Sequence, residues 1–175
     1  MVSRSESRLE GVFVNKILRI GLALSLTLAV RSVSAQNTKT KDAVYYAAPS
    51  ALQTETDEYT RYELLDPETA SFKIYYEVTA TTAGAKFYYN PIRKGSVVSD
   101  ESVYDAMSGK PLHFEVVSGA EARKDVLMAD ADLDTEYIKV TLARPVPENG
   151  QGRILIVKTY KDAKSYYADG KTIVF

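Results

Sequence analysis

Apolar and polar residues alternate at every second position in several stretches from Ser71 onward. In the clearest stretch, Phe72, Ile74 and Val78 point to one side and the residues between them to the other, as in a strand with one packed and one solvated face. Similar stretches occupy 85–89, 112–117 and 137–142, and residues 154–157 are apolar on both faces, as in a central strand. This pattern predicts an all-β fold, an antiparallel β-sandwich-like domain.

Turn signals separate these stretches and set the expected pairing. Ala83-Gly84 suggests a hairpin between 71–79 and 85–90, and Asp169-Gly170 suggests another within 165–175. In 112–117 we expect Leu112, Phe114 and Val116 to face inward. Outside the N-terminal segment, helical turns are expected only at 100–107 and 120–128.

The first 35 residues have the pattern of a secretory signal peptide. Basic residues precede the apolar run 20–30, and Val33 and Ala35 stand where a signal peptidase reads small side chains. An uncleaved membrane anchor is the alternative, but this run has 11 residues, whereas a spanning helix needs about 20. We expect cleavage after Ala35 and a secreted or periplasmic mature chain with no transmembrane span.

The sequence divides into three expected segments: a signal peptide at 1–35, an extended leader or linker at 36–58, and the β-sandwich domain at 59–175. The leader is polar and shows no sustained period of 2 or 3.6 residues. The chain ends at Phe175 within an apolar strand pattern. Because domain termini usually carry polar tails, we expect a domain truncated at its C-terminus, the N-terminal part of a larger exported protein.

Charge and cysteine content exclude several classes of function. The 22 basic and 23 acidic residues become 17 and 21 without residues 1–35, which hold five basic and two acidic ones. A weakly acidic chain without a basic run disfavours nucleic-acid binding. The absence of cysteine excludes disulfides, thiolate catalysis, Cys-ligated zinc and iron–sulfur clusters within this chain.

No motif in the chain predicts catalysis. His113 is the only histidine, and alternation places it on the outer face beside Glu115, where we interpret it as a surface residue rather than a general base or metal ligand. The HExxH, GxSxG and Gly-rich phosphate motifs do not occur. We therefore expect no cofactor, and no enzymatic activity of this chain by itself.

An acidic stretch resembles the start of a calcium-binding loop. Asp130, Asp132 and Asp134 recur at every second position, as the first ligands of such a loop do. The match then fails, because Thr135 replaces the glycine of the sharp turn and Thr141 replaces the bidentate glutamate. A metal site at the three aspartates is one hypothesis, and a solvated acidic loop is the other.

Tyrosine is abundant and often paired, with 13 tyrosines and no tryptophan in the chain. Adjacent tyrosines in a strand face opposite sides, so each pair should place one ring in the core and one on the surface. Tyr75 and Tyr88 are the surface candidates for binding a peptide, glycan or protein. The alternative is ordinary β propensity, with phenols that reach water.

Three segments between Tyr104 and Tyr160 resemble a known family. They are a loop leading into a strand at 105–112, an amphipathic strand ending in proline at 136–145, and a glycine turn at 147–150 that leads into 153–160. This succession resembles the N-terminal β domain of M1-type zinc aminopeptidase-like proteins. The resemblance implies a β module that packs on a downstream catalytic domain, and nothing here matches that family's zinc ligands or catalytic glutamate.

The favoured hypothesis is a non-catalytic exported β-sandwich module that packs on or binds a protein or peptide partner. Its edge strands and outer tyrosines would make the contact, by strand addition or aromatic packing. One alternative is the N-terminal domain of a metallopeptidase-like hydrolase whose active site lies beyond Phe175. Another is a glycan-binding module, which the absence of tryptophan disfavours.

Overall fold

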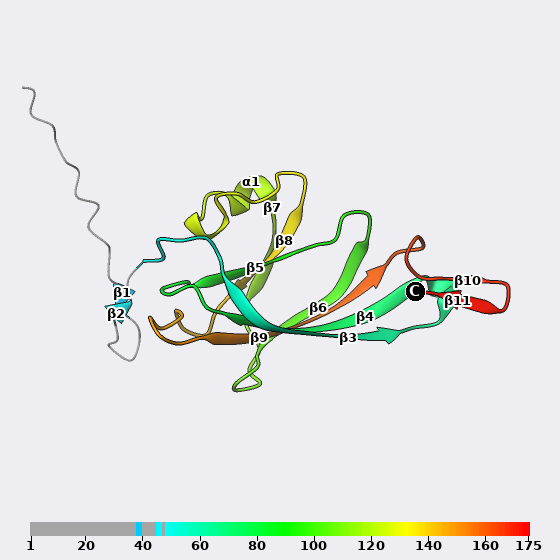
Figure 1. Cartoon of the computed structure of the whole chain (residues 1–175), viewed down its shortest axis with the longest axis horizontal. Helices are drawn as coiled ribbons and strands as arrows, with labels where there is room; N and C mark the ends of the chain where they lie inside the picture. Colours follow the sequence, from blue (N-terminus) through cyan, green and yellow to red (C-terminus); the bar gives the residue numbers. More distant parts are fainter. Residues whose placement is uncertain (1–37, 40–44, 47) are drawn as a thin grey trace, which may run out of the picture. The chain divides into compact units, whose positions relative to one another are not determined.

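A computed structural model of the chain describes residues 38–39, 45–46 and 48–175. The predicted signal peptide and most of the predicted leader lie outside these residues. Figure 1 shows a fold built almost entirely of antiparallel strands, in two larger sheets and two short strand pairs, with short helical turns at the loops. The predicted all-β, sandwich-like architecture is confirmed.

The larger sheet has four strands in the order β3-β4-β9-β6. They are β3 (Glu55–Leu64), β4 (Ser71–Ala80), β9 (Gly152–Lys161) and β6 (Val97–Asp105). β4 and β9 form the centre and pair along their whole length, from Ser71 opposite Lys161 to Ala80 opposite Gly152. β3 and β6 are therefore the two edges.

The smaller sheet has three strands in the order β5-β8-β7. They are β5 (Phe87–Pro91), β8 (Glu136–Thr141) and β7 (Phe114–Ser118). Two short pairs complete the strands: β1 (Thr38–Lys39) with β2 (Tyr45–Tyr46), and β10 (Tyr167–Asp169) with β11 (Thr172–Val174). The helical turns are η1 (Pro67–Thr69), α1 (Gly119–Ala122) and η2 (Val126–Met128).

The hydrophobic core lies between the inner faces of the two sheets. Alternate residues of β4 and β9 supply one side, and Ile138 and Val140 of β8 supply much of the other. Ile154, Ile156, Ile138 and Val140 have no measurable exposure. Because burial of one such side chain contributes roughly 1.5–3 kcal/mol, this layer accounts for much of the stability of the fold.

Each edge of the four-stranded sheet contains a bulge built on the dipeptide Asp-Glu. The register of β3 shifts between Thr56 and Tyr59, and that of β6 shifts between Ser99 and Ser102. At these points Asp57 and Asp100 have φ of 51° and 52°. Aspartate is one of the few non-glycine residues that tolerates this left-handed conformation, which explains its position in both bulges.

The two edges differ in what lies beside them. The outer side of β6 is partly covered, because Asp105 N–H donates to the carbonyl of Lys110 and Leu112 N–H donates to that of Val103. β3 has no strand beside its outer edge among the described residues, and all ten of its residues are exposed. β3 is therefore the open edge of the sheet.

Several sequence expectations about pairing are wrong. Residues 71–79 and 85–90 do not form a hairpin, because β4 pairs with β3 and β9 whereas β5 pairs with β8 in the other sheet. Residues 100–107 lie mostly in β6 rather than in a helical turn. In the stretch 112–117, Leu112 and Phe114 pack against the core as expected, but Val116 is exposed and Val117 is buried instead.

The predicted boundary between linker and domain also moves. β3 begins at Glu55, so the last residues of the stretch 36–58 belong to the sheet. Gln53 is held too: its amide nitrogen donates to the carbonyl of Tyr89 at 2.9 Å, and its side-chain oxygen accepts from Tyr89 N–H at 2.7 Å. These bonds imitate a strand pair and fasten the segment before β3 to β5.

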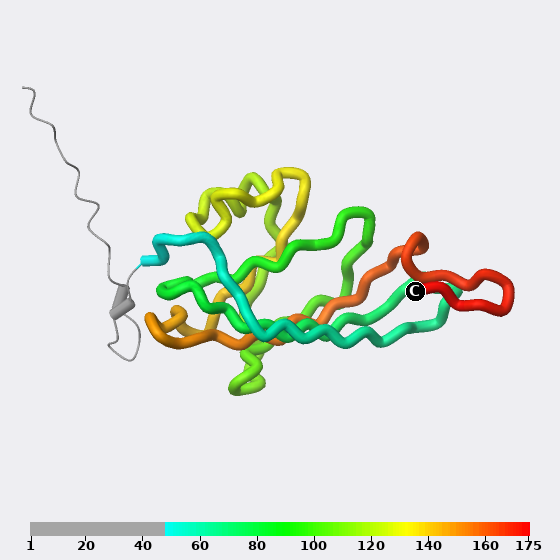
Figure 2. The backbone as a smooth tube through the Cα atoms, viewed as in Figure 1, coloured from blue at the N-terminus to red at the C-terminus, as the bar shows by residue number. Residues whose placement is uncertain are grey.

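The last hairpin and the turns at 120–128 agree with expectation. Gly170 has φ of 59° in the β10–β11 turn, as the Asp-Gly signal predicts. α1 and η2 fall within 119–128. Figure 2 shows the red C-terminal hairpin beside the turn that joins β3 to β4, at the same end of the four-stranded sheet.

Candidate functional site

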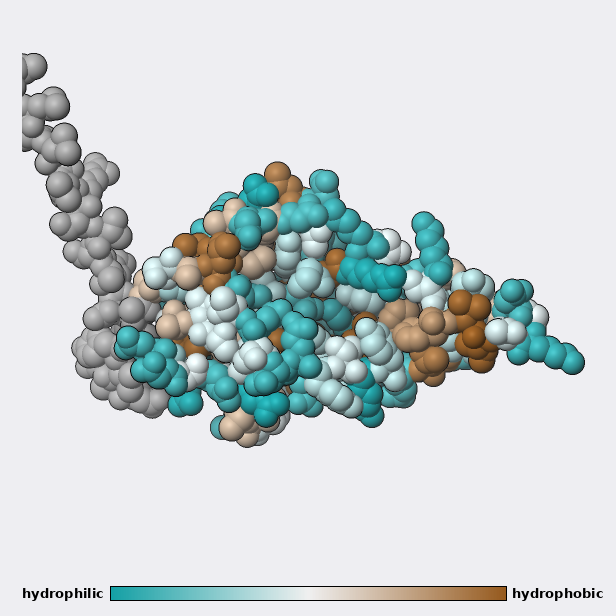
Figure 3. Space-filling view, viewed as in Figure 1, coloured by the Kyte–Doolittle hydropathy of each residue, from teal (hydrophilic) through white to brown (hydrophobic). Residues whose placement is uncertain are grey.

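Large apolar side chains are exposed at the end of the four-stranded sheet where β3 turns into β4. Tyr62, Leu64 and Phe175 are 51%, 45% and 57% exposed. Figure 3 shows apolar side chains gathered at this end of the domain, near the C-terminal hairpin. We call Tyr62, Leu64 and Phe175 the apolar surface. Contiguous exposed apolar side chains are characteristic of interaction sites.

The apolar surface rests on a rigid aromatic support. Phe72 is buried in β4, and the ring of Phe175 lies 5.2 Å from it and 5.3 Å from Tyr62, both in edge-on geometry. Tyr160 and Tyr166 pack against Phe72 at 6.1 and 6.4 Å. Such edge-to-face packing holds the exposed rings in fixed positions, which lowers the entropy lost when a partner covers them.

A cleft of about 470 Å³ opens beside these rings. Its walls include Tyr62, Phe72 and Phe175, together with Arg93 and Lys164. The Arg93 guanidinium donates to Ser165 Oγ at 2.7 Å and lies 3.7 Å from the Asp162 carboxylate. The cleft therefore combines an aromatic wall with a cationic rim.

Backbone groups of β3 add hydrogen-bonding capacity to this end of the sheet. Leu65 N–H donates to the Ser71 carbonyl, so Leu65 faces β4 with its backbone groups. In an antiparallel ladder every second residue bonds to the same neighbour. Thr60, Tyr62 and Leu64 therefore direct their N–H and C=O groups away from β4. The free edge and the apolar surface thus share two residues.

The outer face of β3 and β4 holds an alternating set of charges around Tyr75. The Arg61 guanidinium carbon lies 3.8 Å from the centre of the Tyr75 ring, and Tyr75 Oη donates to Glu63 at 3.1 Å. Tyr75 is half-buried on this outer face. Whether it takes part in binding stays a prediction.

Tyr88, the second surface candidate, is wrongly placed by the sequence argument. It is 1% exposed, and its neighbour Tyr89 is 3% exposed. Both rings are covered because β5 has one face against the larger sheet and the other beneath Gln53 and Asp125, to which Tyr89 bonds. Tyr88 Oη instead donates to the Glu55 carboxylate at the start of β3.

Tyr88 belongs to a polar cluster with Glu55, Glu58 and Tyr76. The β3 bulge interrupts the alternation, so residues 55 and 58 reach the same cluster, and Tyr76 Oη donates to Glu58 at 2.9 Å. Burial raises the pKa of Glu55, and Glu58 raises it further against the effect of the Tyr88 hydrogen bond. The hydrogen bonds from Glu55 and Tyr76 lower the pKa of Glu58, so the two carboxyls of the cluster shift in opposite directions.

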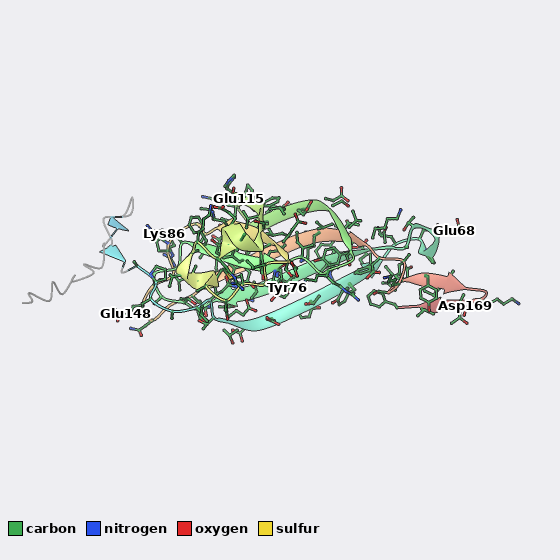
Figure 4. All side chains as sticks on the ribbon, turned by 90° about the horizontal axis from the view of Figure 1, so that it is seen from above. Glu68, Tyr76, Lys86, Glu115, Glu148 and Asp169 are labelled. Carbon is green, nitrogen blue, oxygen red and sulfur yellow. The ribbon has the colours of Figure 1, made fainter. Side chains whose placement is uncertain are left out.

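A buried amine lies on the inner face of the same sheet. Lys158 is 5% exposed, and its Nζ donates to Asn90 Oδ1 at 2.5 Å. Burial lowers the pKa of Lys158 to about 8, against the attraction of the half-buried Glu101 in the β6 bulge. Figure 4 looks down on the domain and marks Tyr76 near its middle and Asp169 at the hairpin tip.

The three aspartates of the predicted metal loop do not form a ligand set. Asp132 accepts from Lys94 Nζ at 2.8 Å and from Asp134 N–H at 2.9 Å. Among the described residues, no three His, Cys, Asp or Glu side chains are grouped as metal ligands. The geometry of 130–134, Asp130 included, is that of an exposed turn. His113 is also exposed, as expected.

Sequence patterns did not identify most of the residues in β3 beside the apolar surface. Arg61, Tyr62 and Glu63 fall in a strand with no buried residue, so they carry no alternating signal. The one available signal was the run of charged and aromatic residues before Asp66-Pro67, a turn that marks the end of a strand. Lys158 directly follows the apolar run 154–157, so alternation gives no sign that its amine is buried.

No model of a protein family matches the chain, and no curated protein matches it significantly. In the residues that the structure describes, no helix is long and apolar enough to cross a membrane.

Proposed function

We propose that this chain is a non-catalytic, exported interaction module that binds a protein partner through the β3 edge and the apolar surface. The observation that supports this most is the open edge itself. Ten consecutive residues of β3 are exposed, with large apolar side chains at Tyr62 and Leu64. Soluble proteins normally protect such an edge, and an unprotected one is a template for strand addition.

Two further features support a protein rather than a small molecule. Backbone groups at Thr60, Tyr62 and Leu64 are spaced for an added strand, which a polypeptide alone supplies. The apolar surface beside them would cover alternate side chains of that strand. Export, as predicted from residues 1–35, would place the module outside the cytoplasm.

A photo-crosslinking residue at Tyr62 tests this proposal in the organism that makes the protein. We expect one major crosslinked protein at Tyr62, identified by mass spectrometry, and none at Val97, which is 66% exposed on the other edge. Crosslinking at neither position, or equally at both, would contradict the proposal.

A binding measurement with purified components completes the test. Leu64→Asp is expected to weaken binding of the identified partner roughly 10-fold or more, because it places a charge in an apolar contact. Val97→Asp is the matched control and should leave the affinity unchanged. Circular dichroism would establish that both variants are folded.

A further inference from the structure

We propose that the partner at the β3 edge is a second copy of this chain, paired antiparallel about a two-fold axis at Tyr62. This inference rests on the proposed function and names the partner for the same surface. The pairing would join two four-stranded sheets into one continuous sheet.

The length of the available strand defines the position of the axis. On one side, the regular part of β3 begins at Tyr59, immediately after the bulge. On the other side β3 ends at Leu64, and its hydrogen bonding to the β4 side extends one residue further, to Leu65 N–H, before the turn. The midpoint of residues 59–65 is Tyr62. A strand that pairs with its own copy uses its whole length only when the axis passes through this midpoint.

The hydrogen-bonding pattern agrees with this axis. An antiparallel pair centred on Tyr62 places Tyr62 opposite itself and Thr60 opposite Leu64. These are the residues whose N–H and C=O groups point away from β4. If the axis lay between Arg61 and Tyr62, each residue whose backbone groups point away from β4 would lie opposite a residue whose groups point toward β4. The hydrogen-bonded ladder between the two copies would then not form.

The side chains at this register are complementary. Arg61 lies opposite Glu63 of the second copy, and two-fold symmetry creates this pair twice. Both are exposed on the outer face, where Tyr75 already contacts each of them within one copy. These positions form non-hydrogen-bonded pairs, in which side chains approach most closely. Opposite charges at directly opposed positions stabilise a strand pair, and like charges destabilise it.

The apolar residues fall on the opposite face of the joined strands. Tyr62 meets its own copy at the axis, and Leu64 lies opposite Thr60. The Phe175 ring already contacts Tyr62, so it borders the new contact. Association would therefore cover the exposed aromatic rings that the isolated domain leaves in water, and this supplies an apolar contribution beside the hydrogen bonds.

The other edge of the sheet does not offer an equivalent contact. Beyond its bulge, β6 is already bonded to the segment Lys110–Leu112. Before its bulge β6 offers only the three residues Val97–Ser99, and they carry no charge. Within the four-stranded sheet, the edge suited to self-association is therefore β3 rather than β6.

Charge reversal tests this register directly, with the oligomeric state of the full chain measured by sedimentation equilibrium. Arg61→Glu places two glutamates opposite each other across the axis, and Glu63→Arg places two arginines there. Each variant should therefore dissociate roughly 30-fold more readily than the parent chain. The double variant Arg61→Glu with Glu63→Arg restores opposite charges and should dimerise like the parent. An equimolar mixture of the two single variants should form a heterodimer.

A single cysteine provides an independent geometric test. Because the chain has no cysteine, Tyr62→Cys introduces the only thiol, and opposed Cα atoms of a bonded strand pair lie about 5.5 Å apart, within disulfide range. We expect rapid oxidation to a covalent dimer for Tyr62→Cys and little for Val97→Cys on the other edge. All variants are identical in the chain before β3, so any association through that segment is common to all.

The outcomes separate this inference from the proposed function. A monomeric parent chain, or single reversals that dimerise as well as the parent, would overturn the inference. If Tyr62 then crosslinks to a different protein, the proposed function stands without the dimer. If Tyr62 crosslinks to no protein at all, both are wrong.

Discussion

The two edge strands of the four-stranded sheet contain the same bulge in different surroundings. In β3 the dipeptide is Asp57-Glu58 and in β6 it is Asp100-Glu101, with nearly equal φ at the two aspartates. Glu58 accepts from Tyr76 beside a second carboxyl, whereas Glu101 faces the buried amine of Lys158. Beyond the bulge, β6 is partly covered by the segment 110–112, whereas no described strand lies beside the outer edge of β3.

This difference shows that the Asp-Glu dipeptide determines the bulge, but not whether the edge strand that contains it is open or covered. Both bulges interrupt the alternation and turn a glutamate toward the inner side of the sheet. The neighbours decide the outcome, because Lys158 supplies a counter-charge on one side and Glu55 a like charge on the other. Independently of these charges, residues 110–112 bond to the outer side of β6, whereas all ten residues of β3 are exposed.

The largest expected difference between the edges is in stability. Thr60, Tyr76, Ile156 and Val103 form one row across the sheet, so Thr60 and Val103 are equivalent positions on the two edges. Val103 is 2% exposed, and Val103→Ala should lower the free energy of unfolding by about 2.5 kcal/mol. Thr60→Ala should change it by less than about 0.5 kcal/mol. If urea denaturation showed equal losses of unfolding free energy for the two variants, the proposed difference between the edges would be wrong.

The next largest effect concerns the pH dependence of stability. The pKa of Lys158 is about 8 in the folded chain and 10.5 ordinarily, so the unfolded chain binds more protons between these values. The free energy of unfolding should therefore rise with pH above 8, by about 1.5 kcal/mol up to about pH 9.5. Below pH 8 the full cost of burying the ammonium is present.

Lys158→Met serves as the control for this rise, because it keeps the volume and removes the titration. We expect its free energy of unfolding to be flatter than that of the parent over the same range, measured by denaturation at each pH. Above about pH 10 the opposite trend should set in, since burial raises the pKa of Tyr76 and Tyr88 in the folded chain. Parallel curves for parent and variant would contradict the assignment.

Substitution of the bulge aspartate should have the same effect on stability at both edges, although the surroundings of the two bulges differ. Alanine tolerates left-handed φ less well than aspartate, so Asp57→Ala and Asp100→Ala should each lower the free energy of unfolding by about 1 kcal/mol. Asp57→Gly and Asp100→Gly should not lower it, because glycine adopts this conformation freely. Thermal denaturation of the four variants would measure this, and a loss at only one edge would break the equivalence.

The smallest effect is confined to the carboxyl pair at the open edge. Glu58→Gln removes a neighbouring charge, so the pKa of Glu55 should fall toward its ordinary value. Titration of the Glu55 side-chain carbon resonance by NMR measures this shift. Glu63→Gln, on the same strand but the other face, is the control and should leave it unchanged. An unchanged pKa in Glu58→Gln would mean that burial alone perturbs Glu55.

The interior of the fold could be predicted because burial imposes periodicity. β4, β8 and β9 alternate or are continuously apolar, and their predicted bounds differ from the observed ones by only a few residues. The edges could not be predicted in the same way. β3 buries none of its residues, and the bulge in β6 places Asp100 and Glu101 where a strand pattern should continue.

The candidate site was harder to predict than the fold. Alternation assigns Tyr75 and Tyr88 to faces of their own strands, but it cannot show that β5 is covered on both sides, so the surface assignment of Tyr88 failed. The apolar surface joins Tyr62 and Leu64 to Phe175, more than a hundred positions away in the chain. Single-sequence patterns contain no information about such a contact.

The placement of the first and last strands has a mechanical consequence. The chain enters the sheet at Glu55, and Phe175 lies at the opposite end of the four-stranded sheet (Figure 1). Tension applied between these points would first peel away the short β10–β11 hairpin and then slide β3 against β4 along their common direction. All the hydrogen bonds of that ladder would be loaded together rather than in succession. A domain connected in this way should resist pulling far better than a hairpin opened from one end, and force spectroscopy between residues 55 and 175 would register a single high unfolding peak.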